Sequence, residues 1–252
     1  MVGFGILADG ALVLLAAVSL LLHELAHILL VKVFGGKVSG FRLGLPGATL
    51  WVRGVYRFKP RERYAVYLAG PGVNAIIALA AWKSAQFLYE PPEILQYVFL
   101  YNIVLCVFNL LPVFPLDGGR VLQIFLGNRM GVLRANRYII KAGLCTGSVL
   151  MVLGLVQAVL YPWNITLLCA GVYIRRKNKM PAQLYWECLQ ALLAKNKEHM
   201  PVVVIKIKKP VTMIKAVEYL RWDYMAIIKI APNRVITEGA LLGYIGMKGN
   251  AV

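Results

Sequence analysis

Charged side chains are scarce in this chain of 252 residues: 15% are Asp, Glu, Lys or Arg, against 60% that are hydrophobic. That balance is too apolar for an ordinary soluble domain, although a large soluble α/β protein with buried parallel strands can approach it. The length of the uncharged runs decides against the α/β alternative, because buried strands are much shorter. A membrane protein is therefore expected.

Five uncharged runs predict membrane-spanning helices, since a helix needs about 20 apolar residues to cross a bilayer. The runs cover residues 11–22, continuing helically to Val31, and residues 64–82, 97–116, 142–160 and 163–174. We predict an α-helical polytopic membrane protein with about five transmembrane helices. The first helix covers residues 11–34, and the further spans cover residues 64–88, 97–116, 141–160 and 162–175.

Acidic residues are the rarer charge, with 11 Asp and Glu against 28 Lys and Arg, which gives a net charge of +17. In a soluble protein this excess would suggest a nucleic-acid partner. Here the basic residues gather in bands beside the predicted spans, at 32–63, 120–141 and 175–179, whereas the alternate loops 83–96 and 161–162 hold one Lys. The positive-inside rule then places the N-terminus outside the cell and the C-terminal tail in the cytosol.

Cysteine and histidine are also few. The four cysteines, Cys106, Cys145, Cys169 and Cys188, show no paired spacing, which argues against a disulfide scaffold and a cysteine-based zinc site. Of the three histidines, His199 follows the spans and is expected on the surface, whereas the other two lie together in the first helix. That helix starts too near the N-terminus to leave a cleavable signal, so we expect a retained anchor.

The two remaining histidines belong to His23-Glu24-Leu25-Ala26-His27, an H-E-x-x-H pattern inside an apolar helix. A spacing of four residues puts both imidazoles on one helix face, one turn apart, where they can bind one zinc ion. Glu24 then projects beside the metal, where a general base takes a proton from water. Ionisable groups at membrane depth are costly unless they line a cavity, pair or bind metal; the alternative is a His/Glu cluster that hydrogen-bonds between helices.

A catalytic zinc site usually has three protein ligands, so a third ligand is expected. Of the three aspartates only Asp117 adjoins a span. It follows Pro112 and Pro115, which break the third span and free backbone carbonyls that a protein-lined cavity must satisfy. The two glycines after it permit a tight re-entry of the chain, and a short amphipathic helix over residues 120–126 can follow. Asp117 is the candidate ligand, and an N-cap of that helix is the alternative.

These motifs resemble those of the site-2 proteases, a family of intramembrane zinc metalloproteases. The family carries H-E-x-x-H on one transmembrane helix and N-x-x-P-x-x-x-L-D-G on another, and the chain has the second pattern at residues 109–118. An Ala69-Gly70-Pro71 turn with Asn74, opening the second span, is similar to the family's A-G-P-x-x-N signature. Small residues there would let two helices approach closely around the site.

The resemblance implies one catalytic Zn²⁺ held by His23, His27 and Asp117, with Glu24 as the catalytic base. Asn109 and Asn74 are the candidates for residues that position the substrate. Asn109 lies two turns before Asp117 and would point into the same broken region, where it could stabilise an oxyanion or bond to freed backbone.

The order of parts is most similar to the stage IV sporulation protein FB branch, which cuts a membrane-associated pro-sigma factor and carries a CBS domain. That branch has a further span before the catalytic helix, whereas in this sequence only residues 1–9 stand before that helix. In the tail, residues 202–207 and 224–230 predict strands with a helix over 211–220 between them, and residues 234–242 look like the closing strand and helix of one CBS motif. Nucleotide binding, docking of a partner and a packing role without ligand stay open.

Residues 41–58 predict a β-hairpin whose edge could add a substrate segment as a strand, or whose basic residues could hold lipid headgroups. The expected domains are a transmembrane zinc metalloprotease domain at 1–178 with this hairpin at 38–60, a linker at 179–200, and a small C-terminal α+β (CBS-like) cytosolic domain at 201–252.

The expected activity is hydrolysis of a peptide bond in a membrane-associated protein. The partners are that substrate and the lipid bilayer, and no nucleic acid; an inhibitor or regulator protein, a nucleotide at the tail and a homo-oligomer stay open. A zinc transporter and an inactive, substrate-binding relative are the alternatives. A transporter should spread polar residues over several spans, whereas here they concentrate in two places.

Overall fold

The computed structural model describes residues 2–44, 47–53, 58–161, 164–179, 192, 200–207, 213–230 and 234–249. His199, Cys188, almost all of the predicted linker and parts of the predicted hairpin lie outside these ranges. The chain forms two compact units: residues 1–112 with 116–118, and residues 113–115 with 119–252.

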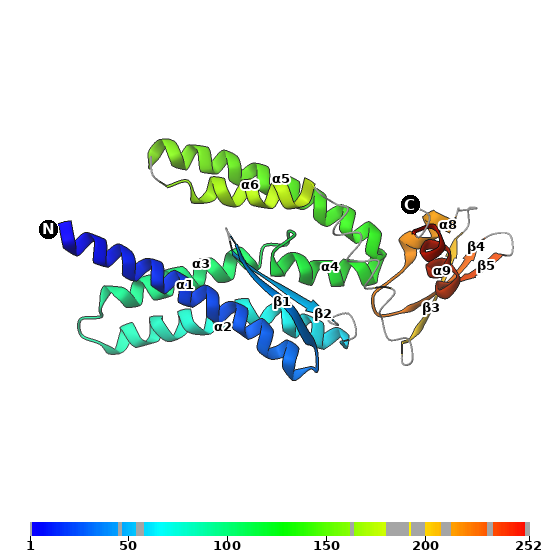
Figure 1. The fold of residues 1–252 in the computed structure, drawn as a ribbon, viewed down its shortest axis with the longest axis horizontal. Helices are drawn as coiled ribbons and strands as arrows, with labels where there is room; N and C mark the ends of the chain where they lie inside the picture. The colour runs from blue at the N-terminus through cyan, green and yellow to red at the C-terminus, as the bar shows by residue number, and fades with distance from the viewer. Residues whose placement is uncertain are drawn as a thin grey trace. The chain divides into compact units, whose positions relative to one another are not determined.

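The first unit packs three helices, α1 (Val2–Val33), α2 (Pro60–Phe87) and α3 (Glu93–Asn109), with α2 lying against both of the others (Figure 1). α1 begins well before residue 11. α2 begins at Pro60, where a missing N–H costs nothing, and the Glu62 carboxylate accepts the Lys59 N–H at 2.9 Å. Residues 69–71 lie inside α2, so the predicted turn there is wrong.

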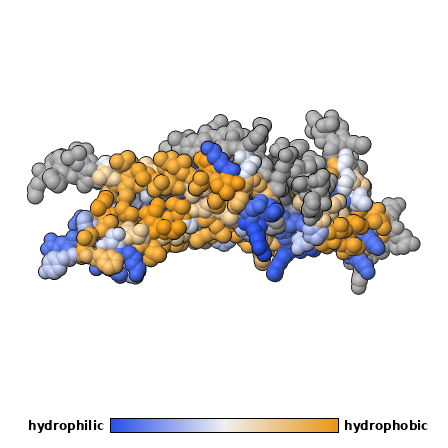
Figure 2. Space-filling view, turned by 90° about the horizontal axis from the view of Figure 1, so that it is seen from below, coloured by the Kyte–Doolittle hydropathy of each residue, from blue (hydrophilic) through white to orange (hydrophobic). Residues whose placement is uncertain are grey.

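The helices of this unit expose apolar side chains and bury polar ones. Val13, Ile76 and Val107 are 70%, 68% and 58% exposed, and much of the helical surface is hydrophobic (Figure 2). The buried polar residues include Ser19, His23, Asn74 and Asn102. A bilayer is the solvent that suits this arrangement, because lipid tails solvate apolar faces while buried polar groups bond to one another.

A two-stranded antiparallel sheet stands where the hairpin was predicted. β1 (Lys37–Gly44) pairs with β2 (Gly47–Arg53), from Lys37 opposite Arg53 to Gly44 opposite Gly47, with a register shift between Val38 and Gly40. The hairpin follows α1 directly, so it begins close in the chain to the C-terminal part of α1, which contains His23 and His27.

The second unit contains most of α4 (Asp117–Met130), then α5 (Val132–Leu160) and α6 (Thr166–Lys179). α4 is longer than the predicted helix over residues 120–126. α5 and α6 lie side by side (Figure 1) because small residues face the contact: a Cβ on Gly154 would come within 2.3 Å of the Leu168 backbone nitrogen.

Within the described ranges, three helices are long and apolar enough to cross a membrane: residues 10–33 of α1, 61–87 of α2 and 132–160 of α5. α3 has 17 residues and α6 has 14. At about 1.5 Å per residue, α3 is roughly 26 Å long, against a hydrocarbon core of about 30 Å. Five transmembrane helices therefore stay a prediction.

The tail forms a small α+β fold. Its sheet has the order β3 (Val202–Ile207), β4 (Met225–Ile230), β5 (Arg234–Thr237), with β3 and β4 parallel and β4 and β5 antiparallel. A parallel pair needs a crossover, which contains α8 (Met213–Ala216) and the 3₁₀ turn η2 (Val217–Tyr219); α9 (Glu238–Gly249) closes the fold. The strands agree with the predicted ones, and the CBS resemblance stays a prediction.

The tail contacts the corner between α4 and α5, all within the second unit. The Val132 N–H donates to the Leu220 carbonyl at 2.8 Å, and the Asp223 N–H donates to Asn128 Oδ1 at 3.1 Å. Glu218 accepts from Arg134 and Arg137 at 3.3 and 3.0 Å. These bonds fix η2 and the residues after it on the two helices.

Candidate metal centre

His23 and His27 lie one turn apart on α1, as their spacing predicts, and both face inward. Their side chains are buried, at 2% and 7% residue exposure, and their ring centroids are 4.9 Å apart. Glu24, between them in sequence, is half-buried on the same turn. The helix therefore presents two imidazoles to the interior of the unit.

Asp117 reaches the histidines from the first residue of α4. The chain leaves α3 at Asn109, and residues 110–116 form a loop without regular structure. A Cβ on Gly118 would lie 2.1 Å from the Leu110 carbonyl oxygen, and one on Gly119 would lie 2.3 Å from the Val113 carbonyl. The two glycines are needed because the loop packs directly on the first turn of α4, and this packing sets where Asp117 stands.

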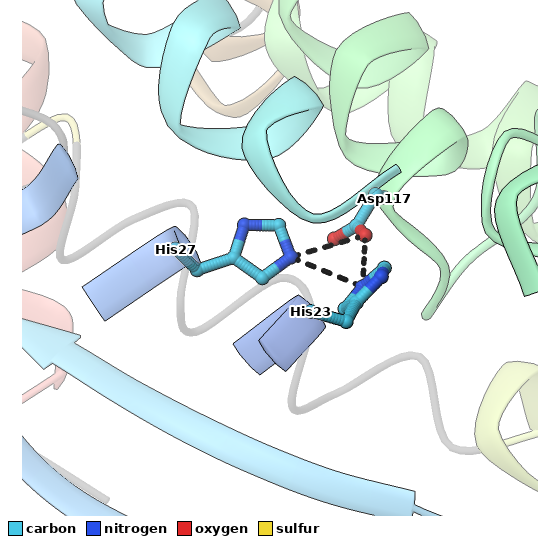
Figure 3. A group of neighbouring side chains, drawn as sticks. All are labelled: His23, His27 and Asp117. Atoms are coloured by element: carbon cyan, nitrogen blue, oxygen red, sulfur yellow. Dashed lines mark hydrogen bonds and ion pairs between the residues drawn. The ribbon is translucent and has the colours of Figure 1, made fainter. Parts of the chain in front are cut away.

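The three side chains form a nearly equilateral triangle of donor atoms (Figure 3). Asp117 Oδ2 is 3.1 Å from His23 Nε2 and 3.2 Å from His27 Nε2, and the two Nε2 atoms are 3.3 Å apart. Donor atoms of a tetrahedral zinc site lie about 3.3 Å apart when the metal–ligand bonds are about 2.0–2.1 Å long. The spacing therefore fits one face of such a site.

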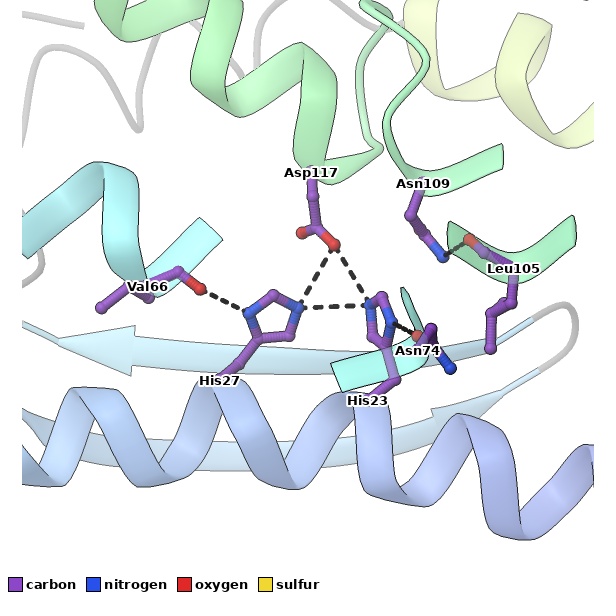
Figure 4. A network of polar contacts seen from close by, with 7 residues as sticks. All are labelled: His23, His27, Val66, Asn74, Leu105, Asn109 and Asp117. Atoms are coloured by element: carbon purple, nitrogen blue, oxygen red, sulfur yellow. Dashed lines mark hydrogen bonds and ion pairs between the residues drawn. The ribbon is translucent and has the colours of Figure 1, made fainter. Parts of the chain in front are cut away.

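The far nitrogen of each ring is held by an acceptor. His27 Nδ1 lies 2.7 Å from the Val66 carbonyl oxygen, and His23 Nδ1 lies 2.5 Å from Asn74 Oδ1 (Figure 4). An acceptor at Nδ1 requires the proton there, which leaves Nε2 with its lone pair. Two such nitrogens and a carboxylate oxygen repel one another at 3.3 Å unless a cation lies between them, so the donor set is compatible with a zinc ion.

Gly70 of α2 makes this approach of helices possible. A Cβ there would lie 2.4 Å from His27 Nε2 and 2.5 Å from His23 Nε2. The position therefore admits no side chain without moving the rings. The close helix contact expected for the residues around Gly70 is present, although they are helical rather than a turn.

The two asparagines predicted to position substrate lie near the site. Asn109 ends α3 and donates from Nδ2 to the Leu105 carbonyl at 3.0 Å, a bond within its own helix (Figure 4). Asn74 is fully buried, between His23 and Asn102, to which it donates at 2.7 Å. Their roles toward substrate stay predictions.

Sequence reasoning missed Ser19, Val66 and Asn102. Asn102 lies in the apolar run 97–116, and Ser19 stands one helical turn before His23, so each was a lone polar residue at membrane depth. That signal could have marked them. The Val66 carbonyl carries no side-chain signal and could not have been found.

Known proteins resemble this chain in a family profile, in individual sequences and in a solved structure. The profile of peptidase family M50 matches residues 84–154, which include the loop before Asp117. A zinc metalloprotease of Methanocaldococcus jannaschii is 29% identical over 65% of this chain and 47% of its own length, and stage IV sporulation protein FB of Bacillus subtilis is 30% identical over 50% and 43%.

Among solved structures, a site-2 protease from Methanocaldococcus jannaschii matches with a TM-score of 0.53 and 27% identity, over 67% of this chain and 76% of that chain. The chain spans less than half the length of the two curated relatives. The sequence profile, the named relatives and the shared fold agree: residues 84–154 match peptidase family M50, and the similar proteins are named as zinc metalloproteases and a site-2 protease.

Proposed function

We propose that the chain is an intramembrane zinc metalloprotease that hydrolyses a peptide bond of a membrane-associated protein. His23, His27 and Asp117 hold the metal, and Glu24 is the catalytic base. The observation that carries the proposal is the triangle of two imidazoles and one carboxylate, with sides of 3.1, 3.2 and 3.3 Å, beside the glutamate of an H-E-x-x-H helix.

A Zn²⁺ ion bound at such a site lowers the pKa of water toward about 7 and polarises the carbonyl under attack. Glu24 takes a proton from the attacking water and delivers it to the nitrogen of the leaving amine. Glu24 therefore ends the reaction in the protonation state in which it began. The acceptors on the Nδ1 atoms hold both rings with Nε2 facing inward.

The domain is integral to the membrane, in keeping with its family and its three long apolar helices. We extend this to five spans, with α3 and α6 crossing as well, a domain over residues 1–178, a linker over 179–200, and a CBS-like domain over 201–252. The basic bands support an orientation with the N-terminus outside and the tail in the cytosol. The metal centre then opens to a cytosolic substrate segment.

The narrower proposal for the substrate is a pro-sigma factor. It rests on the similarity to a relative named for sporulation, with which this chain shares 30% identity over half its length. Asn109 and Asn74 lie near the metal ligands and would position the substrate chain.

The test is co-expression of wild type and Glu24→Gln with membrane-associated pro-proteins. The Gln variant keeps the size of the side chain and loses its basicity, so it should bind zinc at one ion per chain and leave the pro-protein uncut. Glu93→Gln, an exposed change in the first turn of α3, is the matched control and should cut normally.

Three other outcomes decide against parts of the proposal. Cleavage by Glu24→Gln at near the wild-type rate would remove the role of Glu24. Zinc transport by a wild type that cuts nothing would favour the transporter, and a wild type that binds both zinc and substrate without cleavage would be an inactive relative.

A further inference from the structure

Four buried polar side chains form a continuous hydrogen-bonded line through the three helices of the first unit. Ser19 and His23 come from α1, Asn74 from α2 and Asn102 from α3, and none is more than 4% exposed. The contacts run from His23 Nδ1 to Asn74 Oδ1, from Asn74 Nδ2 to Asn102 Oδ1 at 2.7 Å, and from Asn102 Nδ2 to Ser19 Oγ at 3.1 Å.

The direction of this line is set at its far end. Asn102 Nδ2 also donates to the Val98 carbonyl at 2.9 Å, one turn earlier on α3. A backbone carbonyl can only accept, so the amide nitrogen must face it and Oδ1 must face Asn74. The Ser19 hydroxyl can accept or donate, so it takes the second amide proton without setting the direction.

Each later bond follows from the one before. Because Asn102 presents an oxygen, Asn74 must present its amide nitrogen, and Asn74 Oδ1 is left to face the ring. That oxygen can only accept, so His23 carries its proton on Nδ1 and offers an unprotonated Nε2 to the metal. A flip of either amide would oppose two acceptors or two donors in a buried site, which costs about 1–3 kcal/mol per unmade bond.

We propose that Asn102 is a positioning residue that, through Asn74, holds His23 in the Nδ1–H tautomer required of a metal ligand. His27 reaches the same tautomer directly from the Val66 carbonyl. Asn102 touches neither metal nor substrate. The inference rests on the proposed metal site and is independent of the proposed proteolysis.

The test uses Asn102→Leu, which is similar in size and has no polar atom. Residues bonded behind a metal ligand typically contribute about 10–100-fold to metal affinity, so zinc affinity should fall by that factor. In the zinc-free protein labelled with ¹⁵N-histidine, the ring shifts of His23 should change from the Nδ1–H tautomer to a mixture, while those of His27 stay unchanged. Asn102→Ala replaces the leucine variant if that protein does not accumulate.

Two variants should keep the tautomer. Asn102→Asp, in the protonated form of its carboxyl group, still donates to the Val98 carbonyl and places its other oxygen against Asn74 Nδ2, and Ser19→Ala leaves the Val98 carbonyl to orient the amide. Asn136→Leu is the matched control for the loss of a buried amide: Asn136 is equally buried in α5 and accepts from Gln123 at 2.9 Å, in the second unit.

A fall in zinc affinity with altered His23 shifts in Asn102→Leu, and neither effect in Asn136→Leu, supports the proposal. Wild-type affinity and unchanged shifts in Asn102→Leu would overturn it, as would an equal loss of zinc in Asn136→Leu. Failure of the wild type to bind zinc would instead refute the proposed function, so the two failures are separate.

Discussion

Gly70 of α2 faces His23 and His27, two of the proposed metal ligands, so a methyl group there tests the proposed metal centre directly. An alanine Cβ would lie 2.4 Å from His27 Nε2 and 2.5 Å from His23 Nε2. Ordinary contact begins at 3.4 Å, so the two rings would have to retreat by about 1 Å in a close-packed interior. Metal sites tolerate deviations of about 0.2 Å. We expect Gly70→Ala to lower zinc affinity at least about a hundredfold, or roughly 2.8 kcal/mol.

Gly72, two residues along the same helix, is the matched control, because a Cβ there would meet nothing within 4 Å. Replacing glycine by alanine inside a helix stabilises it by about 1 kcal/mol. Gly72→Ala should therefore bind zinc like the wild type and unfold at the same or a higher temperature.

The assay is competition for zinc with a chelator on the purified proteins in detergent, together with thermal unfolding of the zinc-free forms and cleavage of a substrate. Gly70→Ala should lose zinc and cleavage together. Retention of wild-type zinc affinity by Gly70→Ala would refute the placement of the metal on this face of the two rings. An equal loss in Gly72→Ala would trace the effect to α2 as a whole rather than to the methyl group.

The contact of the tail with the α4–α5 corner gives two further predictions. Gly131 has φ +98°, and a Cβ on it would lie 2.0 Å from the Glu218 carbonyl oxygen, so Gly131→Ala should release the tail and speed its cleavage in limited proteolysis. Burial raises the pKa of Glu218, but the hydrogen bonds and the positive charges of Arg137 and Arg134 lower it by more. The net result is a pKa below its ordinary value of 4.5. Stability from these bonds is present above pH 4.5 and is lost as the pH falls through the lower folded pKa. Proteolysis of the tail should therefore speed up as the solution is acidified below pH 4.5, and Glu218→Gln should lack this step.

Patterns within a single element were predictable from the sequence. The histidine pair depends on the i, i+4 geometry of one helix, and the tail strands depend on runs of β-branched residues, so neither needs knowledge of distant contacts. The ends of helices were less predictable, because hydropathy marks the apolar length and not the helical length. α5 starts at Val132 since Arg134, Arg137 and Lys141 are good helix formers outside the apolar run.

Contacts between helices could not be predicted from local patterns. Asn74 and Asn102 are far apart in the sequence, and their bond exists only because α2 and α3 pack at one particular register. The same holds for Asp117, whose candidacy rested on the scarcity of aspartate, while its place depends on how the loop after Asn109 packs against Gly118 and Gly119.

In this unit the contacts that pack the helices together are also the contacts that orient the proposed histidine ligands. Lipid gives helices no hydrophobic reason to associate, so close approach at small residues and hydrogen bonds of about 0.6–1.7 kcal/mol must hold them together. Gly70 supplies the close approach, and the bonds joining Asn102, Asn74 and His23 supply the registration of three helices. His27 needs one bond to a backbone carbonyl, which no side-chain substitution removes, whereas His23 depends on two amides that can each be mutated. Of the two proposed histidine ligands, His23 is therefore the one whose tautomer depends on side chains outside the ligand set.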